Sequence, residues 1–475
     1  MLSAVAPAQA GDEAALLAFK AAAIAGGVYG GDPLPSWNGS GAGVFCGWEG
    51  VRCGRRHRRV VALSLPSLGL SGTLSPAVGN LTFLRTLNLS SNWFNENIPA
   101  SIGRLVNLNT LDLSYNTFSG ALPVNLSFCT SLCVLRLRAN KLHGRIPVEL
   151  GHKLTSLRKV SFKNNSFTGG IPVSLANMSS LYFLDLGRNQ LEGPIPTELG
   201  RIGALRFLYL YDNNHSGVLP QSLYNLSMLQ DFFVNTNSLS GTIPTNIGDR
   251  FPKIETLNFS DNMFCGTIPH SLSNLSSLMN LQLAKNNFCG RVPPTLGRLS
   301  KGLVSLNLYA NKLEANDKDG WEFITVLANC SHLQRLALRN NSFSGKLPSS
   351  IANLSISLRY LHLGNNRISG FIASNIGNLV GLEVLDMANT SISGAVPESI
   401  GRLENLVAIY LYMTRLSGLI PWSLGNLTQL NELIIFNGNL EGAIPASLGN
   451  INNLFVLDLS TNRLNGSIPK ELGKP

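Results

Sequence analysis

Histidine, aspartate and glutamate are the side chains that most often bind metals or catalyse reactions, and here their spacing fits neither role. The seven histidines lie at positions 57, 143, 152, 215, 270, 332 and 362, with no spacing typical of a metal site. Asp317, Asp319 and Gly320 resemble part of a calcium-binding loop, but Ala315 and Val326 stand where its first and last ligands belong. We interpret this segment as a solvated loop and expect no metal and no cofactor.

Catalytic and nucleic-acid-binding motifs are also missing from the sequence. It contains no phosphate-binding GxxxxGK[ST] string and no kinase signature, so we expect the chain itself not to be an enzyme. A serine/threonine kinase domain would have to follow residue 475. The basic run between residues 52 and 59 lacks the interleaved aromatic residues of nucleic-acid-binding surfaces, so we interpret it as a solvated connector.

The composition describes a chain that can fold but carries few charges. Of 475 residues, 44% are hydrophobic and only 13% are charged, so the polar surface must come largely from uncharged side chains. The formal charge of +10 is spread thinly along the chain and does not by itself indicate nucleic acid as a partner. No apolar stretch is long enough to cross a membrane.

The elements that position any functional side chain come from a repeat of 24 or 25 residues. The first apolar residue of each L-x-x-L-x-L-x-x-N-x-L unit lies at position 84, 108, 132, 157, 181, 205, 229, 254, 278, 303, 333, 358, 382, 406, 430 and 454. A weaker unit begins at Val60, which gives about seventeen repeats over residues 60–475, the last one incomplete. Since one unit cannot bury its apolar face alone, the repeats must stack into a solenoid.

Within each unit the pattern predicts a short strand followed by a buried amide. Leu111 and Leu113 alternate with polar residues, as in a strand with one buried face, and successive strands should stack in parallel. An Asn such as Asn116 or Asn140 follows at a fixed offset, where an inward amide can pair with backbone groups of the turn. We expect these amides to form a ladder.

The string L-x-x-L-x-L-x-x-N-x-L-S-G-x-I-P resembles the plant-specific leucine-rich repeat of receptor kinases, receptor-like proteins and polygalacturonase inhibitors. Residues 12–59 resemble the cap that precedes such repeats, with an amphipathic helix, Trp37, and Trp48 between two cysteines. The resemblance implies an α/β solenoid, a plant-type leucine-rich-repeat horseshoe or superhelix with a parallel concave sheet and an N-terminal disulfide cap.

The 30-residue unit from Leu303 resembles an insertion in the immune-receptor subgroup that contains the rice bacterial-blight resistance kinase and the receptors for flagellin and elongation-factor peptides. Polygalacturonase inhibitors are less similar, because their arrays are shorter.

Cysteine usage indicates an oxidising compartment. The resemblance implies a disulfide between Cys46 and Cys53 in the cap. Cys265 and Cys289 occupy the same position of adjacent repeats, 24 residues apart, and stacking should bring their backbones to about 5 Å. We therefore predict a second disulfide between them.

Two further features indicate secretion. Residues 1–11 end in small residues typical of a signal-peptide cleavage site, and we interpret them as a truncated signal remnant. The alternative is a flexible, Ala-rich start of the chain. Asn-x-Ser/Thr occurs sixteen times, partly as a by-product of the repeat. We expect glycans at Asn38, Asn80, Asn88, Asn125, Asn177, Asn225, Asn258, Asn274, Asn353 and Asn426.

Positions three, five and seven of each unit should face outward from the concave sheet, where a ligand would bind. Basic residues come first along the stack, followed by aromatic residues ringed by charge, as at the centre of an interface. The candidate ligand-binding residues are Arg136, Arg138, Lys159, Lys163, Phe183, Asp185, Phe207, Tyr209, Tyr211, Asp231 and Phe233. A second patch comprises Tyr410, Tyr412 and Phe436. The alternative is aromatic stacking that only stiffens the sheet.

Two of the expected glycans constrain the location of the ligand. Asn88 and Asn258 fall at position five of repeats two and nine, on the concave face. Sugars at these two positions would leave the concave face of repeats three to eight open to a ligand.

The resemblance implies a function in ligand sensing. We expect the extracellular recognition region of a plant receptor-like serine/threonine kinase in innate immunity, which binds a peptide or protein ligand and then a short leucine-rich-repeat co-receptor kinase. Its location would be the extracellular face of the plasma membrane, reached only through a segment after residue 475, or outside the cell if the chain ends there. The alternative is a protein without a kinase, such as an inhibitor of pathogen wall-degrading enzymes. The sequence that follows residue 475 distinguishes the two.

Overall fold

The computed structural model describes residues 7–27, 32–38, 44–300 and 302–473. The chain divides into two compact units, unit 1 up to Leu239 and unit 2 from Ser240. The first six residues of the expected signal remnant lie outside the described residues, and the cap helix begins at Pro7.

The cap of unit 1 consists of helix α1 (Pro7–Ala23), the 3-10 helix η1 (Val44–Gly47) and strand β1 (Val51–Cys53). Its core is aromatic: the rings of Phe19 and Trp37 lie 6.0 Å apart, and those of Trp37 and Trp48 lie 5.3 Å apart. Cys46 and Cys53 form a disulfide across a Cα separation of 5.5 Å, which confirms the predicted pair.

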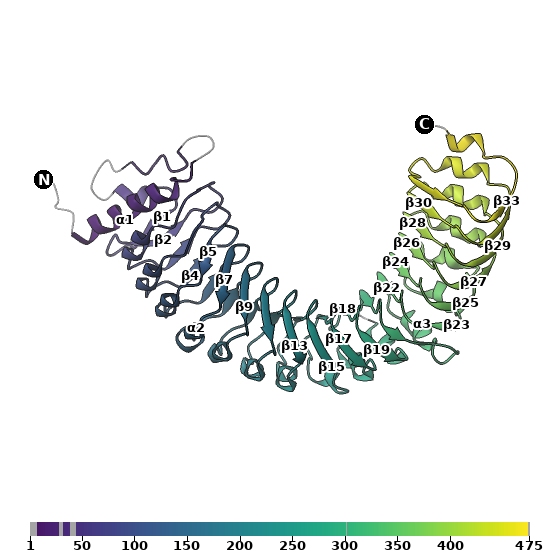
Figure 1. The fold of residues 1–475 in the computed structure, drawn as a ribbon, viewed down its shortest axis with the longest axis horizontal. Coiled ribbons are helices and arrows are strands. Elements are labelled where there is room, and N and C mark those ends of the chain that lie inside the picture. The colour runs from purple at the N-terminus through teal and green to yellow at the C-terminus, as the bar shows by residue number, and fades with distance from the viewer. Residues whose placement is uncertain (1–6, 28–31, 39–43, 301, 474–475) are drawn as a thin grey trace. The chain divides into compact units, whose positions relative to one another are not determined.

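The inner strands of unit 1 pair in parallel from β2 onward, each with the strand of the next repeat (Figure 1). They are β2 (Val60–Ser64), β3 (Thr86–Asn88), β4 (Thr110–Asp112), β6 (Val134–Arg136), β8 (Lys159–Ser161), β10 (Phe183–Asp185), β12 (Phe207–Tyr209) and β14 (Asp231–Phe233). Equal repeat positions lie opposite each other, as Leu87, Leu111 and Leu135 do, and all three leucines are fully buried. The alternation of apolar residues therefore predicted the buried face correctly.

Unit 2 continues the same pattern. Its inner strands are β16 (Thr256–Asn258), β18 (Asn280–Gln282), β20 (Ser305–Asn307), β22 (Arg335–Ala337), β24 (Tyr360–His362), β26 (Val384–Asp386), β28 (Ala408–Tyr410), β30 (Glu432–Ile434) and β32 (Val456–Asp458). The long repeat keeps the register, since Leu306 lies opposite Leu336. Its extra residues form helix α3 (Glu322–Leu327), and the indole of Trp321 donates a 2.8 Å hydrogen bond to the carbonyl of Ser344.

A second set of short strands lies after the Asn of each repeat. In unit 1 these are β5 (Ser119–Ala121), β7 (Lys141–Arg145), β9 (Ser166–Gly169), β11 (Gln190–Gly193) and β13 (Asn214–Val218), and β15 (Ser238–Thr242) lies where the units divide. In unit 2 they are β17 (Met263–Gly266), β19 (Asn287–Gly290), β21 (Lys312–Leu313), β23 (Ser344–Lys346), β25 (Arg367–Phe371), β27 (Ser391–Gly394), β29 (Arg415–Leu419), β31 (Asn439–Gly442) and β33 (Arg463–Leu464).

The outer strands pair in a different register from the inner ones. Gly120 lies opposite Leu142, so the partners are 22 residues apart, whereas inner partners such as Leu87 and Leu111 are 24 apart. Residues at the same position of adjacent repeats are therefore not opposite each other in the outer strands. They are displaced by two residues along the strand.

This register explains why the predicted disulfide between Cys265 and Cys289 is wrong. Cys265 lies opposite Asn287, and both thiols are free and exposed. A displacement of two residues along the strand, added to the spacing between strands, puts the two Cα atoms roughly 8 Å apart. A disulfide does not span that distance without movement of the backbone. Cys129 and Cys330 are also free, but they are buried in the core.

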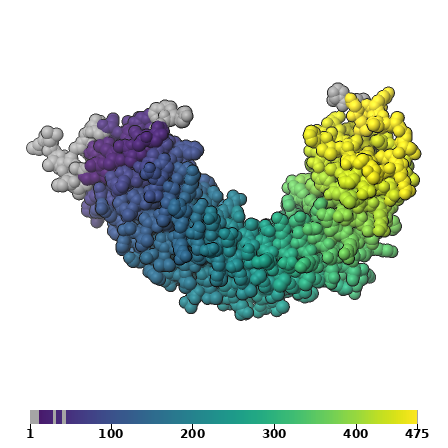
Figure 2. Space-filling model, viewed as in Figure 1, coloured from purple at the N-terminus to yellow at the C-terminus, as the bar shows by residue number. Residues whose placement is uncertain are grey.

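Short helical segments return the chain to the next inner strand. In unit 1 they are η2 (Pro76–Asn80), η3 (Ala100–Arg104), η4 (Val124–Phe128), helix α2 (Val148–Lys153), η5 (Val173–Asn177), η6 (Thr197–Arg201) and η7 (Gln221–Asn225). In unit 2 they are η8 (Ile247–Asp249), η9 (His270–Asn274), η10 (Pro294–Leu299), η11 (Ser349–Asn353), η12 (Ile376–Asn378), η13 (Glu398–Arg402), η14 (Trp422–Asn426), η15 (Ala446–Asn450) and η16 (Lys470–Gly473). Figure 2 shows successive repeats stacked against each other in sequence order within each unit.

The buried asparagines form the predicted ladder. Asn116 donates from Nδ2 to the carbonyls of Leu89 (2.9 Å) and Leu113 (3.1 Å), and its Oδ1 accepts a 2.9 Å bond from the backbone N–H of Phe94. Asn140 repeats this arrangement one repeat later. One side chain therefore satisfies backbone groups of its own repeat and of the repeat before it.

Over the described ranges, no helix combines the length and hydropathy needed to cross a membrane. Within the same ranges, no three His, Cys, Asp or Glu side chains are grouped closely enough to hold a metal ion.

Candidate functional site

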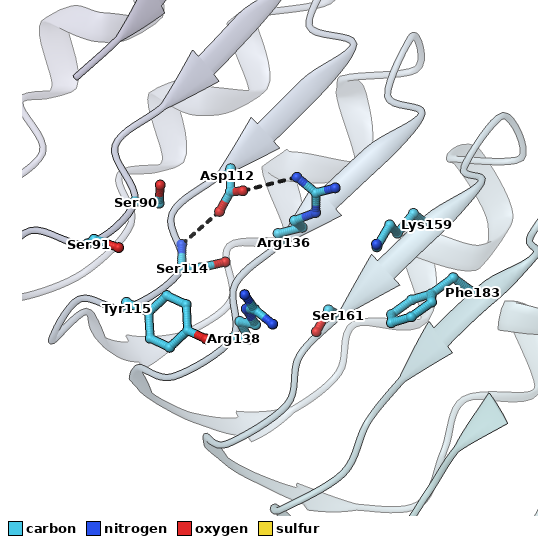
Figure 3. Close-up of a pocket in the computed structure, with 10 residues that line it drawn as sticks. All are labelled: Ser90, Ser91, Asp112, Ser114, Tyr115, Arg136, Arg138, Lys159, Ser161 and Phe183. Carbon is cyan, nitrogen blue, oxygen red and sulfur yellow. Dashed lines mark hydrogen bonds and ion pairs between the residues drawn. The ribbon is translucent and has the colours of Figure 1, made fainter. Parts of the chain in front are cut away.

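A hollow of about 320 Å³ lies on the exposed face of the inner sheet of unit 1 (Figure 3). It is lined by Ser90, Ser91, Asp112, Ser114, Tyr115, Arg136, Arg138, Lys159, Ser161 and Phe183. The parallel register builds it, because Arg136 lies between Asp112 and Ser161 on neighbouring strands, and Lys159 lies opposite Phe183. The structure thus brings three residues of the predicted basic stretch, Arg136, Arg138 and Lys159, together in one hollow.

The cations of the hollow are held in place but only partly neutralised. Arg136 pairs with Asp112 at 3.2 Å, and the guanidinium of Arg138 lies over the ring of Tyr115, 4.7 Å from its centroid. Lys159 lies over the ring of Phe183 at 4.3 Å. Burial lowers the pKa of Lys159, and repulsion from the two arginines lowers it further. This excess of positive charge favours an anionic group of a ligand.

Asp185 contributes to the site from below its surface. Its side chain is buried, with Oδ2 accepting a 3.2 Å bond from the hydroxyl of Ser161 and Oδ1 accepting a 3.2 Å bond from the N–H of Gly187. Burial raises its pKa, while the Gly187 bond and the charge of Lys163 oppose that shift. The carboxylate therefore organises its neighbours and is shielded from direct contact with a ligand.

An aromatic cluster adjoins the hollow; it comprises Phe183, Phe207, Tyr209, Tyr211 and Phe233. Tyr209 is central, with ring centroids 5.6 Å from Phe183 and 5.2 Å from Phe233. All five residues are half-buried, so each ring keeps a surface open to solvent. Lys163 lies 5.5 Å from the ring of Tyr211. Phe183 belongs to both the hollow and the cluster, so charged and apolar surfaces are continuous.

The hydroxyl of Tyr209 is already engaged by a neighbour. It donates a 2.6 Å bond to Oδ2 of Asp231. Burial raises the pKa of Tyr209, and the bond to Asp231 raises it further. The tyrosine is therefore neutral at physiological pH and offers a ligand its ring.

Sequence reasoning missed several lining residues. Asp112 and Ser114 stand at the outward positions five and seven of their repeat, so the same rule could have found them. Tyr115 could not be found in this way, because it stands one position later. Its φ of 55° belongs to a left-handed turn, from which its side chain reaches Arg138.

The second patch lies in unit 2. The rings of Tyr412 and Phe436 are parallel and 4.9 Å apart, and Tyr410 donates a 2.7 Å bond to Glu432. Burial and that bond raise the pKa of Tyr410 to about 12.

The second patch has a buried carboxylate on its own sheet. Asp386 on β26 lies opposite Tyr410 and accepts a 2.6 Å bond from Arg339. Burial opposes the ionised form of this carboxylate, but bonds from His362 and Arg339 outweigh it and lower its pKa. Arg339, which lies beside the second patch, is therefore paired with a buried carboxylate.

The expected glycan sites divide into two groups. Asn38, Asn80, Asn125, Asn177, Asn225, Asn274, Asn353 and Asn426 are exposed. Asn88 and Asn258 are half-buried on inner strands, where each accepts a bond from the backbone N–H two residues later. Asn88 lies opposite Asp112, so a sugar there would stand beside the hollow. Glycosylation at these positions remains a prediction.

Comparison with known families matches most of the chain. Residues 9–54 match the leucine-rich-repeat N-terminal domain, six segments between residues 83 and 275 match the leucine-rich repeat, and residues 321–474 match a leucine-rich-repeat region. The chain is a leucine-rich-repeat protein.

Curated proteins that match segments of the chain include plant receptor kinases. A segment of 88 residues is 54% identical to the receptor kinase-like protein Xa21 of Oryza sativa subsp. japonica, and covers 18% of this chain and 8% of that protein. The plant peptide hormone receptor RGFR1 in complex with RGF2 is similar in structure, with a TM-score of 0.70 and 29% identity over 90% of this leucine-rich-repeat chain and 81% of that one.

The Arabidopsis receptor kinase HAESA, solved with the peptide hormone IDA and the co-receptor SERK1, has a TM-score of 0.70 and 29% identity. The match covers 97% of this chain and 87% of that one.

Proposed function

We propose that the chain is the ligand-recognition region of a plant receptor-like serine/threonine kinase in innate immune signalling, located on the extracellular face of the plasma membrane. The observation that carries the proposal is the continuity of the basic hollow with the aromatic cluster on one sheet face of unit 1. A peptide that lies across β4 to β14 places an acidic group near Arg138 and apolar side chains on Tyr209 and its neighbours.

The similar structures support this reading. RGFR1 and HAESA are described in complex with RGF2 and IDA, and HAESA also with the co-receptor SERK1. By analogy, the bound peptide in this protein completes a surface for a short leucine-rich-repeat co-receptor kinase. The competing hypothesis is that the protein inhibits wall-degrading enzymes. In that case an enzyme, and not a peptide, binds to the same face.

Binding of short synthetic peptides to the 475-residue chain tests the proposal. Libraries with and without acidic residues are compared by titration, and hits are repeated with Arg138→Gln and with Arg145→Gln, an exposed arginine on β7, as matched control. Acidic peptides that need Arg138 but not Arg145 support the proposal. Peptides that bind equally to both variants, or binding only of wall-degrading enzymes, contradict it.

A further inference from the structure

A second basic surface lies where the cap of unit 1 meets the first repeats, and the proposed function does not use it. A groove of about 650 Å³ is lined by five arginines, Arg52, Arg55, Arg56, Arg59 and Arg85, together with His57. Phe83 also lines it, with 41% of its surface exposed. We name this surface the basic groove. Strands β1 and β2, which contribute to its lining, lie at the N-terminal end of unit 1 (Figure 1).

The loop that carries most of these charges is fixed by the fold. Strands β1 and β2 form an antiparallel hairpin, and the N–H of Gly54 donates a 2.9 Å bond to the carbonyl of Arg59. The disulfide from Cys53 to Cys46 anchors the end of β1 at which the loop begins. The cations are therefore presented from a constrained loop, which reduces the entropy lost on binding.

Arg59 ties the loop to the cap helix. Its Nε and Nη2 each lie 2.8 Å from a different oxygen of Asp12, whose side chain is buried. The same carboxylate accepts a 2.9 Å bond from the N–H of Val60. Asp12 is thus the ion-pair partner of Arg59. The guanidinium of Arg59 also lies 4.7 Å from the centroid of the Phe83 ring.

The remaining arginines are not neutralised within the protein. Arg52, Arg55, Arg56 and Arg85 are exposed, and none makes an ion pair with a carboxylate in the part of the chain that the structure describes. Since one exposed ion pair contributes little affinity, a ligand gains from such a groove only by meeting several cations at once. The groove therefore fits a polyanion.

We propose that the basic groove binds an acidic polysaccharide, a polymer of uronic acids. Such a polymer repeats a carboxylate on each sugar, which matches the separate guanidinium groups, and the C–H face of a sugar ring can pack on the exposed ring of Phe83. Single-stranded nucleic acid would need several stacking rings, and Phe83 is the aromatic side chain of the groove lining. The disulfide and the many Asn-x-Ser/Thr sites further indicate a partner outside the cell.

The experiment measures binding of fully de-esterified polygalacturonate to the 475-residue chain, with fully methyl-esterified polymer as uncharged control. The groove variant is Arg52→Gln, Arg55→Gln, Arg56→Gln and Arg85→Gln combined. The matched variant removes the same charge from exposed arginines elsewhere in unit 1, namely Arg145→Gln, Arg158→Gln, Arg201→Gln and Arg206→Gln. Circular dichroism of each variant checks the fold.

We expect the groove variant to lose affinity by about tenfold or more, because several contacts are lost together, while the matched variant changes little. Affinity of the unmodified chain should also fall as salt rises. Phe83→Ala alone should also weaken binding of polygalacturonate, but it should leave the salt dependence of that binding unchanged. Equal loss in both charge variants, equal binding of the methyl-esterified polymer, or binding only to anionic vesicles or acidic peptides would overturn the proposal.

Discussion

The phenol of Tyr209 donates a 2.6 Å hydrogen bond to Oδ2 of Asp231 on the adjacent inner strand. Because the hydroxyl is engaged, the ring is the part of Tyr209 that a ligand can use. Tyr209→Ala should therefore weaken binding of a peptide ligand by about 2 kcal/mol or more, as truncation of an aromatic anchor does. Titration calorimetry gives the change.

Tyr209→Phe separates the two roles. It keeps the ring but leaves Asp231 without its donor, so it should lower the free energy of unfolding by about 1 kcal/mol with little effect on affinity. Phe233→Ala should behave like Tyr209→Ala. If instead Tyr410→Ala and Phe436→Ala abolish binding while both unit 1 variants bind normally, the ligand lies on the second patch.

The cations on the exposed face of the inner sheet of unit 1 should act mainly on the rate of association with a ligand. Arg138 and Lys163 are at least partly open to solvent, so replacing either by Gln should slow association with an acidic peptide several-fold and reduce its salt dependence. The dissociation rate should change less. Surface plasmon resonance at two ionic strengths measures both rates. If the substitutions change only the dissociation rate, these charges are buried in the complex.

His215 should make the stability of the protein depend on pH. It is fully buried at a leucine position of the repeat, and neither ring nitrogen makes a well-formed hydrogen bond. Burial lowers its pKa from 6.5 to about 4, although the backbone of Gly193 acts in the opposite direction. The unfolded chain therefore binds a proton that the folded chain rejects, and about 3 kcal/mol of stability should be lost as the pH falls from about 6.5 to about 4.

His215→Leu should remove this dependence and raise stability at neutral pH, because an apolar side chain suits the site. Urea denaturation at several pH values compares it with His143→Leu, which changes an exposed histidine on an outer strand. If the free energy of unfolding of His215→Leu still falls with pH as it does in the unmodified chain, groups other than His215 cause the acid sensitivity.

The Asn ladder should be costly to interrupt. Asn116→Ala leaves the carbonyls of Leu89 and Leu113 and the N–H of Phe94 without their side-chain partner, and we expect a loss of about 3 kcal/mol. Asn109→Ala, at an exposed position, is the control. Denaturation curves measure the free energy of unfolding of both variants, and equal losses in the two would contradict the structural role of the ladder.

The free cysteines should differ in reactivity according to burial. Burial raises the pKa of Cys129 to about 12 and that of Cys330 to about 11, so both should resist alkylation in the native protein. Cys265 and Cys289 are exposed and should react readily. Mass spectrometry after brief iodoacetamide treatment reads out each site; protection of both exposed thiols would indicate that they are linked after all.

The period of the sequence predicted the inner strands and the ladder, because both depend only on equal positions stacking on each other. Leu87, Leu111 and Leu135 show this directly. The outer register could not be obtained in this way, since the displacement that separates Cys265 from Cys289 arises from how the chain turns between the two strands of a repeat. Tyr115 was missed for a similar reason, since it lies in that turn.

The ladder has a direction, and that direction has an evolutionary consequence. Asn116 serves backbone groups of the preceding repeat, and Asn140 serves the repeat of Asn116 in turn. A whole repeat can therefore be duplicated or deleted between two others, and every amide still finds a neighbour of the kind it requires. Changes in array length and in the order of binding side chains are in this way separated from changes in the core, so new recognition surfaces can arise by exchange of intact repeats.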